Sequence, residues 1–573
     1  MVGLRDETGK GSTATQPTMA SRTGGTGRGV AIGLALAIGL AAFLRFWHLG
    51  SQSIWYDEFV TTQDVHNRFA EMLISALPHT EGSPPLYFIL QWLWLPIAGR
   101  GDAAVRSLAA LAGIATVPVV YVLARELRQT SRVALVAAFL VATNPLFVWY
   151  SQEARPYSLL ALTGAVSVLM WARALRLGRR SDFVWWGVAA AAAFCTHYFA
   201  IFLIVPELVW LLRASRARPP AGTGSGHSAE RDLREDRERR RDVWWGCVPL
   251  AIVVVPLGLL AIAQRGKNQA WIGDFPLELR FAEMGRSYLV GPAEPFGEWW
   301  VLGAAIVVAA AVVALRWGAP NERSAARTMV LLGLSGYALA LLAAFAGADY
   351  ILGRNLIASL IPLLVVVAIG LGTRRAGWLG LVATVVLCAG STLVVGEVAA
   401  RSVFQKPDWR GVAAILDHGG KDRAIVVDAY LGAPLERYLD QTHSFDKKHR
   451  RRMVGSIDLI YRVPKADRRC GRWSGLGCET FFFPRLPAAL GRDFALVHRV
   501  HHAGFIINRY EAAHPRRLTK RQVLGADHKK TSFVIFPASR PDREAAVSRE
   551  SSGQASSPAR PRSRPRPATA RHG

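Results

Sequence analysis

The chain has 573 residues, of which 51% are hydrophobic, and its formal net charge is +27. Such a charge is typical of nucleic-acid-binding proteins, but most Lys and Arg before the C-terminal tail lie in short loops between apolar runs, where they set membrane topology. Apolar runs of about twenty residues recur from Val30 to Val398, and each can cross a hydrocarbon core of about 30 Å. These features exclude a nucleic-acid partner and a purely soluble chain. They predict a polytopic α-helical membrane protein followed by a soluble domain.

The N-terminal part predicts an uncleaved first span. Residues 1–29 are rich in Gly, Ser and Thr and have no apolar pattern, so we expect a disordered cytoplasmic leader. The run Val30–Leu49 is too long for a signal-peptide core and lacks a small-residue cleavage site. We therefore expect a span that starts in the cytoplasm and ends outside near Arg45, Trp47 and His48.

A long outer loop, Gly50–Asp102, follows and contains a short apolar segment. This segment, Pro85–Ala98, has about fourteen residues, which fits an interfacial or re-entrant helix better than a span. If it crossed the membrane, Arg125, Arg128 and Arg132 would face outside, whereas basic loops normally stay in the cytoplasm. We therefore expect this segment on the outer surface.

Basic loops at regular intervals predict the remaining spans, about eleven in total. The run 183–212 is basic at both ends, so it must turn back as a hairpin whose apex, Thr196-His197-Tyr198, lies outside. Residues 213–242 are expected to form a solvated cytoplasmic loop. The other spans are expected at 103–124, 132–149, 157–172, 243–263, 299–315, 328–346, 351–371 and 376–396. This count places the C-terminal region outside and ends the transmembrane domain, 30–399.

The C-terminal region predicts a small extracytoplasmic α/β domain over residues 400–540 and a disordered basic tail over 541–573. Cys470 and Cys478 lie close together in this domain, and they pair only if it faces an oxidising compartment. The β-like runs are Ala424–Val427, Ala495–Val500, Phe505–Ile507 and Phe533–Phe536, and the helical runs are Gly411–Leu416 and Leu435–Leu439.

The topology brings four polar clusters from distant parts of the chain to the outer face. Ionisable groups at span ends that converge on one side of a membrane indicate a functional site. Alternatively, each cluster alone is what any solvated loop contains. The clusters are Asp57-Glu58 with Glu81, the corner Glu153-Arg155-Tyr157, the apex His197-Tyr198, and Asp349-Tyr350 with Arg354-Asn355.

Several of these residues admit a structural and a functional interpretation. Asp57 and Glu58 diverge by about 100° in a helix, so one can act as a base while the other pairs with an arginine or caps a helix, and Asp57 is favoured as the base. Glu153 can pair with Arg155, and His197 can be an ordinary interfacial histidine. Arg354 can snorkel to headgroups or bind a lipid phosphate.

Five segments follow one another in the order IWYDEF, EGSPPLYFILQWLW, NPLFVWYSQEARPYSLLAL, THYFAIFL and DYILGRNLIASLIPL. Together they resemble the bacterial relatives of the protein O-mannosyltransferases over residues 30–400. These relatives are polytopic glycosyltransferases of the GT-C type that use polyprenyl-phosphate sugars. The segment Asp408–Leu416 also resembles the start of their extracytoplasmic domain.

The resemblance implies a GT-C fold, a reaction at the outer face of the cell membrane, and a catalytic Asp in the first outer loop, here Asp57. Many members have His-Pro-Pro where this chain has Ser83-Pro84-Pro85, and Glu81 then partly replaces the histidine. The implied partners are a polyprenyl-phosphate-linked sugar donor and an extracytoplasmic acceptor, which is a glycan, lipid or protein.

Such a transfer needs a base for the acceptor hydroxyl and fixed positive charge at the departing phosphate. Asp57 and Glu58 are the catalytic candidates, and Arg354 and Arg155 are candidates for the donor phosphate. No cofactor is implied, while a divalent metal stays open. The substrate-binding candidates are Glu81, Glu153, Tyr157, His197, Tyr198, Asp349, Tyr350 and Asn355.

Two alternatives to a transferase remain. A transporter or flippase of polyprenyl-linked substrates would show internal repeats and polar groups at mid-membrane. The sequence has no clear repeat, and its charges cluster at one face. The third possibility is a scaffold that presents residues 400–540 to a partner.

Overall fold

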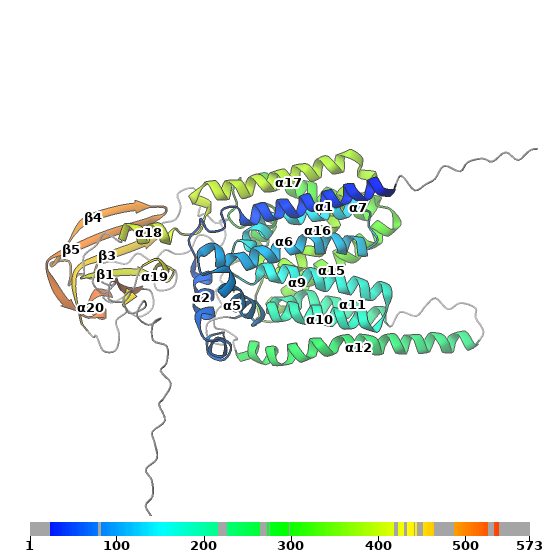
Figure 1. Ribbon diagram of the computed structural model, residues 1–573, viewed down its shortest axis with the longest axis horizontal. Helices are drawn as coiled ribbons and strands as arrows, with labels where there is room; N and C mark the ends of the chain where they lie inside the picture. The colour runs from blue at the N-terminus through cyan, green and yellow to red at the C-terminus, as the bar shows by residue number, and fades with distance from the viewer. Residues whose placement is uncertain are drawn as a thin grey trace, which may run out of the picture. The chain divides into compact units, whose positions relative to one another are not determined.

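The computed structural model describes residues 23–77, 82–215, 226–263, 272–273, 275–296, 298–416, 422–428, 432–439, 442–443, 451–462, 486–524 and 532–537. The chain forms two compact units, one helical and one built around a sheet (Figure 1). The helical unit comprises the chain up to Ser51 together with Val60–Gln405, and the sheet unit comprises Gln52–Phe59 and the chain from Lys406 onward.

The helical unit consists of long helices joined by short turns. The helices are α1 (Thr23–Phe46), α2 (Tyr56–His66, whose first turn groups with the sheet unit), α3 (Phe69–Glu71), α5 (Leu86–Ala98), α6 (Asp102–Glu126), α7 (Ser131–Thr143), α8 (Pro145–Ser151), α9 (Tyr157–Leu177), α10 (Arg180–Thr196), α11 (Ile201–Ala214), α12 (Gly226–Ala263), α13 (Leu277–Val290), α14 (Trp299–Val312), α15 (Pro320–Phe345), α16 (Ile357–Gly372) and α17 (Gly377–Ala400). Shorter turns are η2 (Met72–Ala76), η3 (Tyr198–Ala200), η5 (Val313–Trp317), η6 (Gly353–Leu356), η7 (Arg374–Ala376) and η8 (Ser402–Phe404).

Within the described residues, eight helices are long and apolar enough to cross a membrane, or nine if the bent pair α7 and α8 is one span. The expectation of a polytopic membrane protein is confirmed, but the count of about eleven is not. The two arms of the expected hairpin, α10 and α11, have 17 and 14 residues, fewer than the ~20 that a span normally needs. Helix α5, with 13 residues, is also short, as expected.

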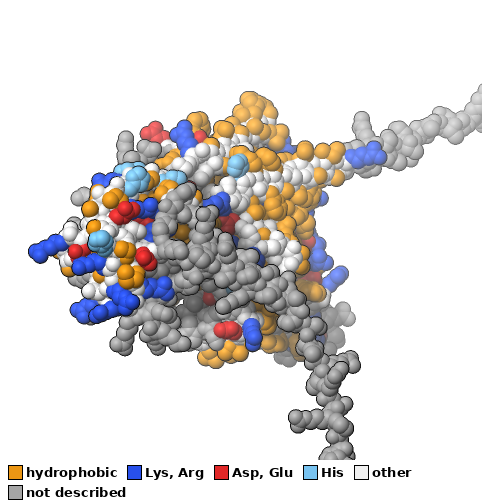
Figure 2. Space-filling model, turned by 60° about the vertical axis from the view of Figure 1, so that its left-hand side comes forward, with side chains coloured by type: hydrophobic (Ala, Val, Ile, Leu, Met, Phe, Trp, Pro, Cys, Tyr) orange, Lys and Arg blue, Asp and Glu red, His pale blue; other side chains and the backbone are white. Residues whose placement is uncertain are grey.

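Large apolar side chains cover the outside of the helical unit. Trp378, Ile252 and Leu393 are 70%, 69% and 66% exposed. In Figure 2, hydrophobic side chains dominate the surface of the helical unit, whereas charged side chains and histidines are frequent on the sheet unit. Contiguous apolar surface of this extent is expected where helices face lipid.

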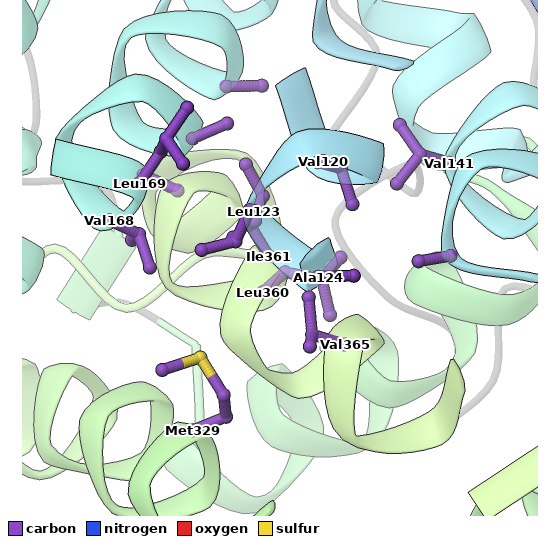
Figure 3. Close-up of a cluster of buried hydrophobic side chains, with 14 of the residues drawn as sticks. Val120, Leu123, Ala124, Val141, Val168, Leu169, Met329, Leu360, Ile361 and Val365 are labelled. Atoms are coloured by element: carbon purple, nitrogen blue, oxygen red, sulfur yellow. The ribbon is translucent and has the colours of Figure 1, made fainter. Parts of the chain in front are cut away.

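Helix α16 forms the centre of the helical core. Nearly all of its apolar stretch is buried, at 89%. Side chains from α6, α7, α9 and α15 pack against it, among them Leu123, Val168 and Met329 (Figure 3). Gly164 of α9 permits a close crossing with α16, because a Cβ atom there would lie only 2.9 Å from the Ala358 Cβ. This crossing fixes the starts of α9 and α16 relative to each other.

A 54° bend separates α7 from α8. Pro145 begins α8, and the N-cap Asn144 restarts the helix with its side chain. Arg45 in the last turn of α1 is fully buried, and its guanidinium donates to the carbonyl oxygens of Val141 and Ala142 at 3.2 and 2.8 Å. A cation at the C-terminal end of α7 satisfies carbonyl groups left free by the bend. The bend therefore has an identifiable cause, and it leads the chain into the corner that contains Glu153.

The sheet unit contains six described strands in the order β2-β6-β1-β3-β5-β4, with β1 and β3 parallel and the other neighbours antiparallel. The strands are β1 (Arg423–Asp428), β2 (Thr442–His443), β3 (Arg452–Arg462), β4 (Phe494–His502), β5 (Phe505–Leu518) and β6 (Ser532–Pro537), and the helices are α18 (Trp409–Leu416), α19 (Leu435–Tyr438) and α20 (Lys520–Leu524).

Both faces of this sheet are covered. Alternate residues of a strand point to opposite faces. Accordingly, Ile425 and Val427 pack with α18 and α19, while Ala424 and Val426 pack with the apolar side chains of α20. The expected small α/β domain is confirmed, and the six β-like and helical runs coincide with the corresponding elements, except that Leu439 lies one residue past the end of α19.

The central strand β3 was not expected, because Asp458 interrupts its apolar pattern. Asp458 is fully buried and accepts from Arg509 Nε at 2.8 Å, and Arg423 Nε lies 3.5 Å away. A buried carboxylate is tolerated when cations neutralise it. Cys470, Cys478 and the expected tail, 541–573, lie outside the described residues.

Candidate active site

The corner between α8 and α9 presents three of the residues predicted from the sequence. The chain turns sharply here, with the Arg155 N–H donating to the Glu153 carbonyl oxygen at 2.8 Å, and α9 then begins at Tyr157. All three side chains are buried: Arg155 is 7% exposed, Glu153 1% and Tyr157 4%. Arg155 Nη1 donates to Thr61 Oγ1 of α2 at 3.0 Å. A buried guanidinium is costly unless it is hydrogen-bonded, so this corner is organised around a cation.

The apex between α10 and α11 carries His197 in a stack of rings. Its imidazole lies between the rings of Tyr157 and Phe199, at centroid distances of 5.5 and 4.5 Å and interplanar angles of 28° and 24°. The ring of Tyr198, the next residue, meets that of Phe194 edge-on. Burial and then the neighbouring Cys195 raise the pKa of Tyr198 to about 12, so its phenol stays protonated.

His197 is held in its neutral form. Burial lowers the pKa of His197 to about 3, and the charges of Arg155 and Arg354 contribute further. The backbone N–H of Phe199 donates to His197 Nδ1 at 3.3 Å. In a neutral imidazole the other nitrogen then carries the proton. His197 therefore offers an Nε2–H donor without adding a third positive charge.

The segment before α16 supplies the third side of this cluster. Arg354 lies in the turn η6, and its Cζ atom is 5.6 Å from the ring centroid of Tyr157. Asn355 donates to the Tyr350 carbonyl oxygen at 2.8 Å, and the ring of Tyr350 lies 5.3 Å from that of Phe199. Three of the four clusters expected on one face are thus brought together around the His197 ring.

Asp349 is engaged in an ion pair that the sequence did not indicate. Arg280 of α13 binds both of its carboxylate oxygens, at 2.6 and 2.8 Å, and Arg280 is only 5% exposed. The hydrogen bonds from Arg280 hold the pKa of Asp349 below its usual range. This carboxylate therefore has a clear structural task, the neutralisation of a buried guanidinium.

The fourth cluster belongs to the sheet unit. Asp57 and Glu58 lie in the first turn of α2, and Asp57 is partly exposed. Glu58 is fully buried, with one carboxylate oxygen 3.3 Å from Lys406 Nζ and 3.4 Å from the donating Trp55 N–H. Of the two neighbouring carboxylates, Glu58 is therefore the one that pairs with a cation and caps the helix. Glu81 lies outside the described residues.

Sequence reasoning missed Thr61, Phe199 and Arg280. Phe199 stands within the segment THYFAIFL, so a second aromatic residue after His197 was a usable signal. Thr61 and Arg280 carry no such signal, because their partners lie far away in the chain. Among the described residues, no group of three or more His, Cys, Asp and Glu side chains gathers as a metal site would require.

A comparison with protein families confirms the resemblance to the protein O-mannosyltransferases. Residues 82–221 match the family described as dolichyl-phosphate-mannose-protein mannosyltransferase. Compared with curated protein sequences, the chain has no match.

Solved structures with a similar fold include ArnT from Cupriavidus metallidurans bound to undecaprenyl phosphate, with a TM-score of 0.50 and 13% identity over 85% of this chain and 98% of ArnT. The Archaeoglobus fulgidus oligosaccharyltransferase AglB with an inhibitory peptide and a dolichol-phosphate has a TM-score of 0.41 and 11% identity over 69% of this chain. The chain spans only 59% of that enzyme. The Saccharomyces cerevisiae Pmt1-Pmt2 complex bound to the sugar donor has a TM-score of 0.31 and 16% identity over 44% of this chain and 36% of that one.

ArnT is a GT-C glycosyltransferase, and the likeness to it confirms the GT-C fold expected from the motifs.

Proposed function

We propose that this chain, which is similar to the dolichyl-phosphate-mannose-protein mannosyltransferases over residues 82–221 and has the GT-C fold, is a membrane glycosyltransferase. It transfers a sugar from a polyprenyl-phosphate donor to an acceptor hydroxyl on the extracytoplasmic side of the cell membrane. The observation that carries the proposal is the convergence of two guanidinium groups, from Arg155 and Arg354, on the stacked imidazole of His197.

The charges of this cluster suit the donor phosphate. In the donor the phosphate is a diester with one negative charge, and it gains a second when the sugar departs. Fixed cations aimed at a charge that develops in the transition state lower its energy. Arg155 and Arg354 supply such cations, and the Nε2–H of His197 supplies a neutral donor beside them. ArnT, which shares the fold, is bound to undecaprenyl phosphate.

Asp57 is proposed as the general base. The acceptor hydroxyl oxygen attacks C1 of the sugar, the bond from C1 to the phosphate oxygen breaks with its electron pair on the phosphate, and the hydroxyl proton passes to Asp57. Attack opposite the phosphate inverts the anomeric centre. Asp57 lies in the first turn of α2 and is partly exposed, so its carboxylate is accessible to an acceptor.

The other polar residues of the cluster are proposed to contact the substrates. Glu153, Tyr157, Tyr198, Tyr350 and Asn355 line the starts of α9 and α16 and the apex between α10 and α11. Asp349 is proposed to act indirectly, through Arg280, and Glu81 stays a prediction. A role for a divalent metal also stays open.

The test uses the full-length protein in membranes with a panel of radiolabelled polyprenyl-phosphate sugars and a mixture of envelope acceptors. We expect labelled glycosidic product with one donor, and a loss of about 10²-fold or more in Asp57→Asn, as for removal of a general base. The exposed carboxylate Glu71 provides the control, since Glu71→Gln should retain full activity. Accumulation of the lipid-linked substrate in vesicles without any glycosidic product would instead indicate a transporter.

A further inference from the structure

The segment Gln52–Phe59, which contains Asp57, groups with the C-terminal sheet unit. Its partners come from a short stretch that follows α17 and from α19, about 350 residues further along. Several independent contacts make this attachment.

Asp408 is the first point of attachment. It precedes α18, and its Oδ1 atom accepts from Gly411 N and from Ser53 Oγ, both at 3.0 Å. Ser53 Oγ in turn accepts from Arg410 N at 3.0 Å. The second carboxylate oxygen lies 2.8 Å from His502 Nε2 of β4. An N-cap residue that also binds a distant serine ties that serine to the start of the helix.

The space around Gly411 shows how closely the side chains of Asp408 and His502 pack. A Cβ atom at this position would lie 2.2 Å from His502 Nε2 and 2.3 Å from Asp408 Oδ2. Both distances are far below van der Waals contact, so only glycine allows the two side chains to approach. Burial alone would raise the pKa of Asp408, but the hydrogen bonds from Gly411, His502 and Ser53 outweigh it and lower the pKa. The carboxylate is therefore held ionised in this position.

Lys406 is the second point of attachment. Its Nζ atom lies 3.3 Å from Glu58 Oε2, with side-chain exposures of 8% and 0%, and 5.9 Å from the ring centroid of Trp55. Its backbone N–H donates to Gln52 Oε1 at 3.1 Å. A third contact runs from the Ile54 N–H to the Tyr438 hydroxyl at 2.7 Å. The residues on both sides of Asp57 are therefore bound by this domain.

We propose that Lys406, Asp408 and Tyr438 of the C-terminal domain are positioning residues, which hold the segment Gln52–Glu58 so that Asp57 is presented to the acceptor hydroxyl. This inference rests on the proposed function of Asp57. It also implies that Glu58 positions the segment through its ion pair with Lys406. The C-terminal domain is then required for efficient transfer. Misplacement of a catalytic group by 1 Å can cost about 10²-fold in rate, so loss of these contacts lowers kcat and leaves the donor KM little changed.

The experiment compares variants of the full-length protein by hydrogen–deuterium exchange and by transfer kinetics. Asp408→Ala and Lys406→Met should speed exchange in peptides covering Gln52–Phe59 and lower kcat at least tenfold. Tyr438→Phe should release protection at the Ile54 amide, whose acceptor it removes. Asp408→Asn keeps the acceptor oxygen for Ser53 and Gly411 and should retain most activity.

A control is available in the same unit. Arg516 and Asp493 form an exposed ion pair near the far end of β5, and Arg516→Gln should change neither exchange nor kcat. Unchanged exchange over Gln52–Phe59 in Asp408→Ala and Lys406→Met would overturn the proposal, whatever their activity. Asp57→Asn separates the two hypotheses, because it should abolish transfer with normal exchange. Full activity in Asp57→Asn would overturn the role of Asp57 as the base. Hydrogen–deuterium exchange over Gln52–Phe59 would still test whether the C-terminal domain holds this segment.

A double-mutant cycle on Glu58 and Lys406 completes the test. If Glu58 acts only through Lys406, the double variant Glu58→Gln/Lys406→Met should have a kcat no lower than that of the less active single variant. If Glu58→Gln abolishes transfer while Lys406→Met has wild-type kcat, Glu58 takes part in the chemistry itself and its positioning role is wrong.

Discussion

The guanidinium group of Arg354 lies over the ring of Tyr157, with 5.6 Å between Cζ and the ring centroid. The contact joins the turn η6, which precedes α16, to the start of α9, and the ring of Tyr157 also stacks with that of His197, with 5.5 Å between the centroids. A ring face orients a guanidinium without neutralising its charge.

This contact predicts different outcomes for conservative substitutions. Tyr157→Phe keeps the ring face and should leave the donor KM within about twofold, whereas Tyr157→Leu removes a cation–π contact of about 1 kcal/mol and should raise it about fivefold. Arg354→Lys keeps the charge but loses the planar fork, and we expect at least a tenfold rise in the donor KM. Steady-state kinetics with varied donor measure this. Equal KM values in wild type and Arg354→Lys would exclude bidentate recognition by Arg354.

The neutral state of His197 predicts a specific dependence of stability on pH. Its pKa is about 3 in the folded protein and about 6.5 in the unfolded chain, because burial and then Arg155 and Arg354 disfavour the cation. Between these values the unfolded chain binds one more proton, so the free energy of unfolding falls as pH drops from about 6.5 toward 3. His197→Asn should weaken this fall, as measured by the midpoint of thermal unfolding in detergent between pH 4 and 7.5.

A matched control for this experiment is the exposed His514, whose substitution by Asn should leave the slope unchanged. If His197→Asn and wild type lose stability in parallel on acidification, the imidazole is not held neutral by the fold.

Much of the helical unit could be predicted from its sequence, because long apolar runs and basic loops each report a strong physical constraint. The convergence of Arg155, His197 and Arg354 followed from topology alone, since alternating spans put these residues at the same end. Contacts within that end were less predictable. Arg280 binds Asp349 across 69 residues, and nothing near either residue in the sequence indicates the other.

The grouping of Gln52–Phe59 with the C-terminal domain was also beyond the sequence. Lys406 and Glu58 are 348 residues apart, and each alone looks like an ordinary loop charge. The missed strand β3 has a similar cause, since Asp458 is acceptable there only because Arg423 and Arg509 lie beside it in the fold. Buried ion pairs between distant segments leave no periodic signal for sequence analysis to detect.

The pair Arg280 and Asp349 predicts a loss of stability and not a loss of substrate binding. Asp349→Asn leaves a guanidinium that is 5% exposed without its counter-charge, and we expect a cost of about 2 kcal/mol in the free energy of unfolding. Combining it with Arg280→Met removes the stranded charge and should recover part of that loss. Thermal unfolding in detergent measures the effect. A large rise in substrate KM in Asp349→Asn at unchanged stability would instead indicate direct contact with substrate.

Glu207 is predicted to have a structural role at the junction of α9, α10 and α11. Its fully buried carboxyl accepts from Ser167 Oγ at 2.6 Å and from Trp186 Nε1 at 2.9 Å, and its carbonyl oxygen accepts from Trp171 Nε1 at 3.0 Å. Glu207→Gln retains an acceptor for both side chains and should fold and turn over normally. Glu207→Ala leaves two buried donors unsatisfied and a cavity, which together should cost about 3 kcal/mol and lower the yield of folded protein. Size-exclusion profiles and transfer assays distinguish these results, and an inactive but stably folded Glu207→Gln would show that the carboxyl group itself serves catalysis.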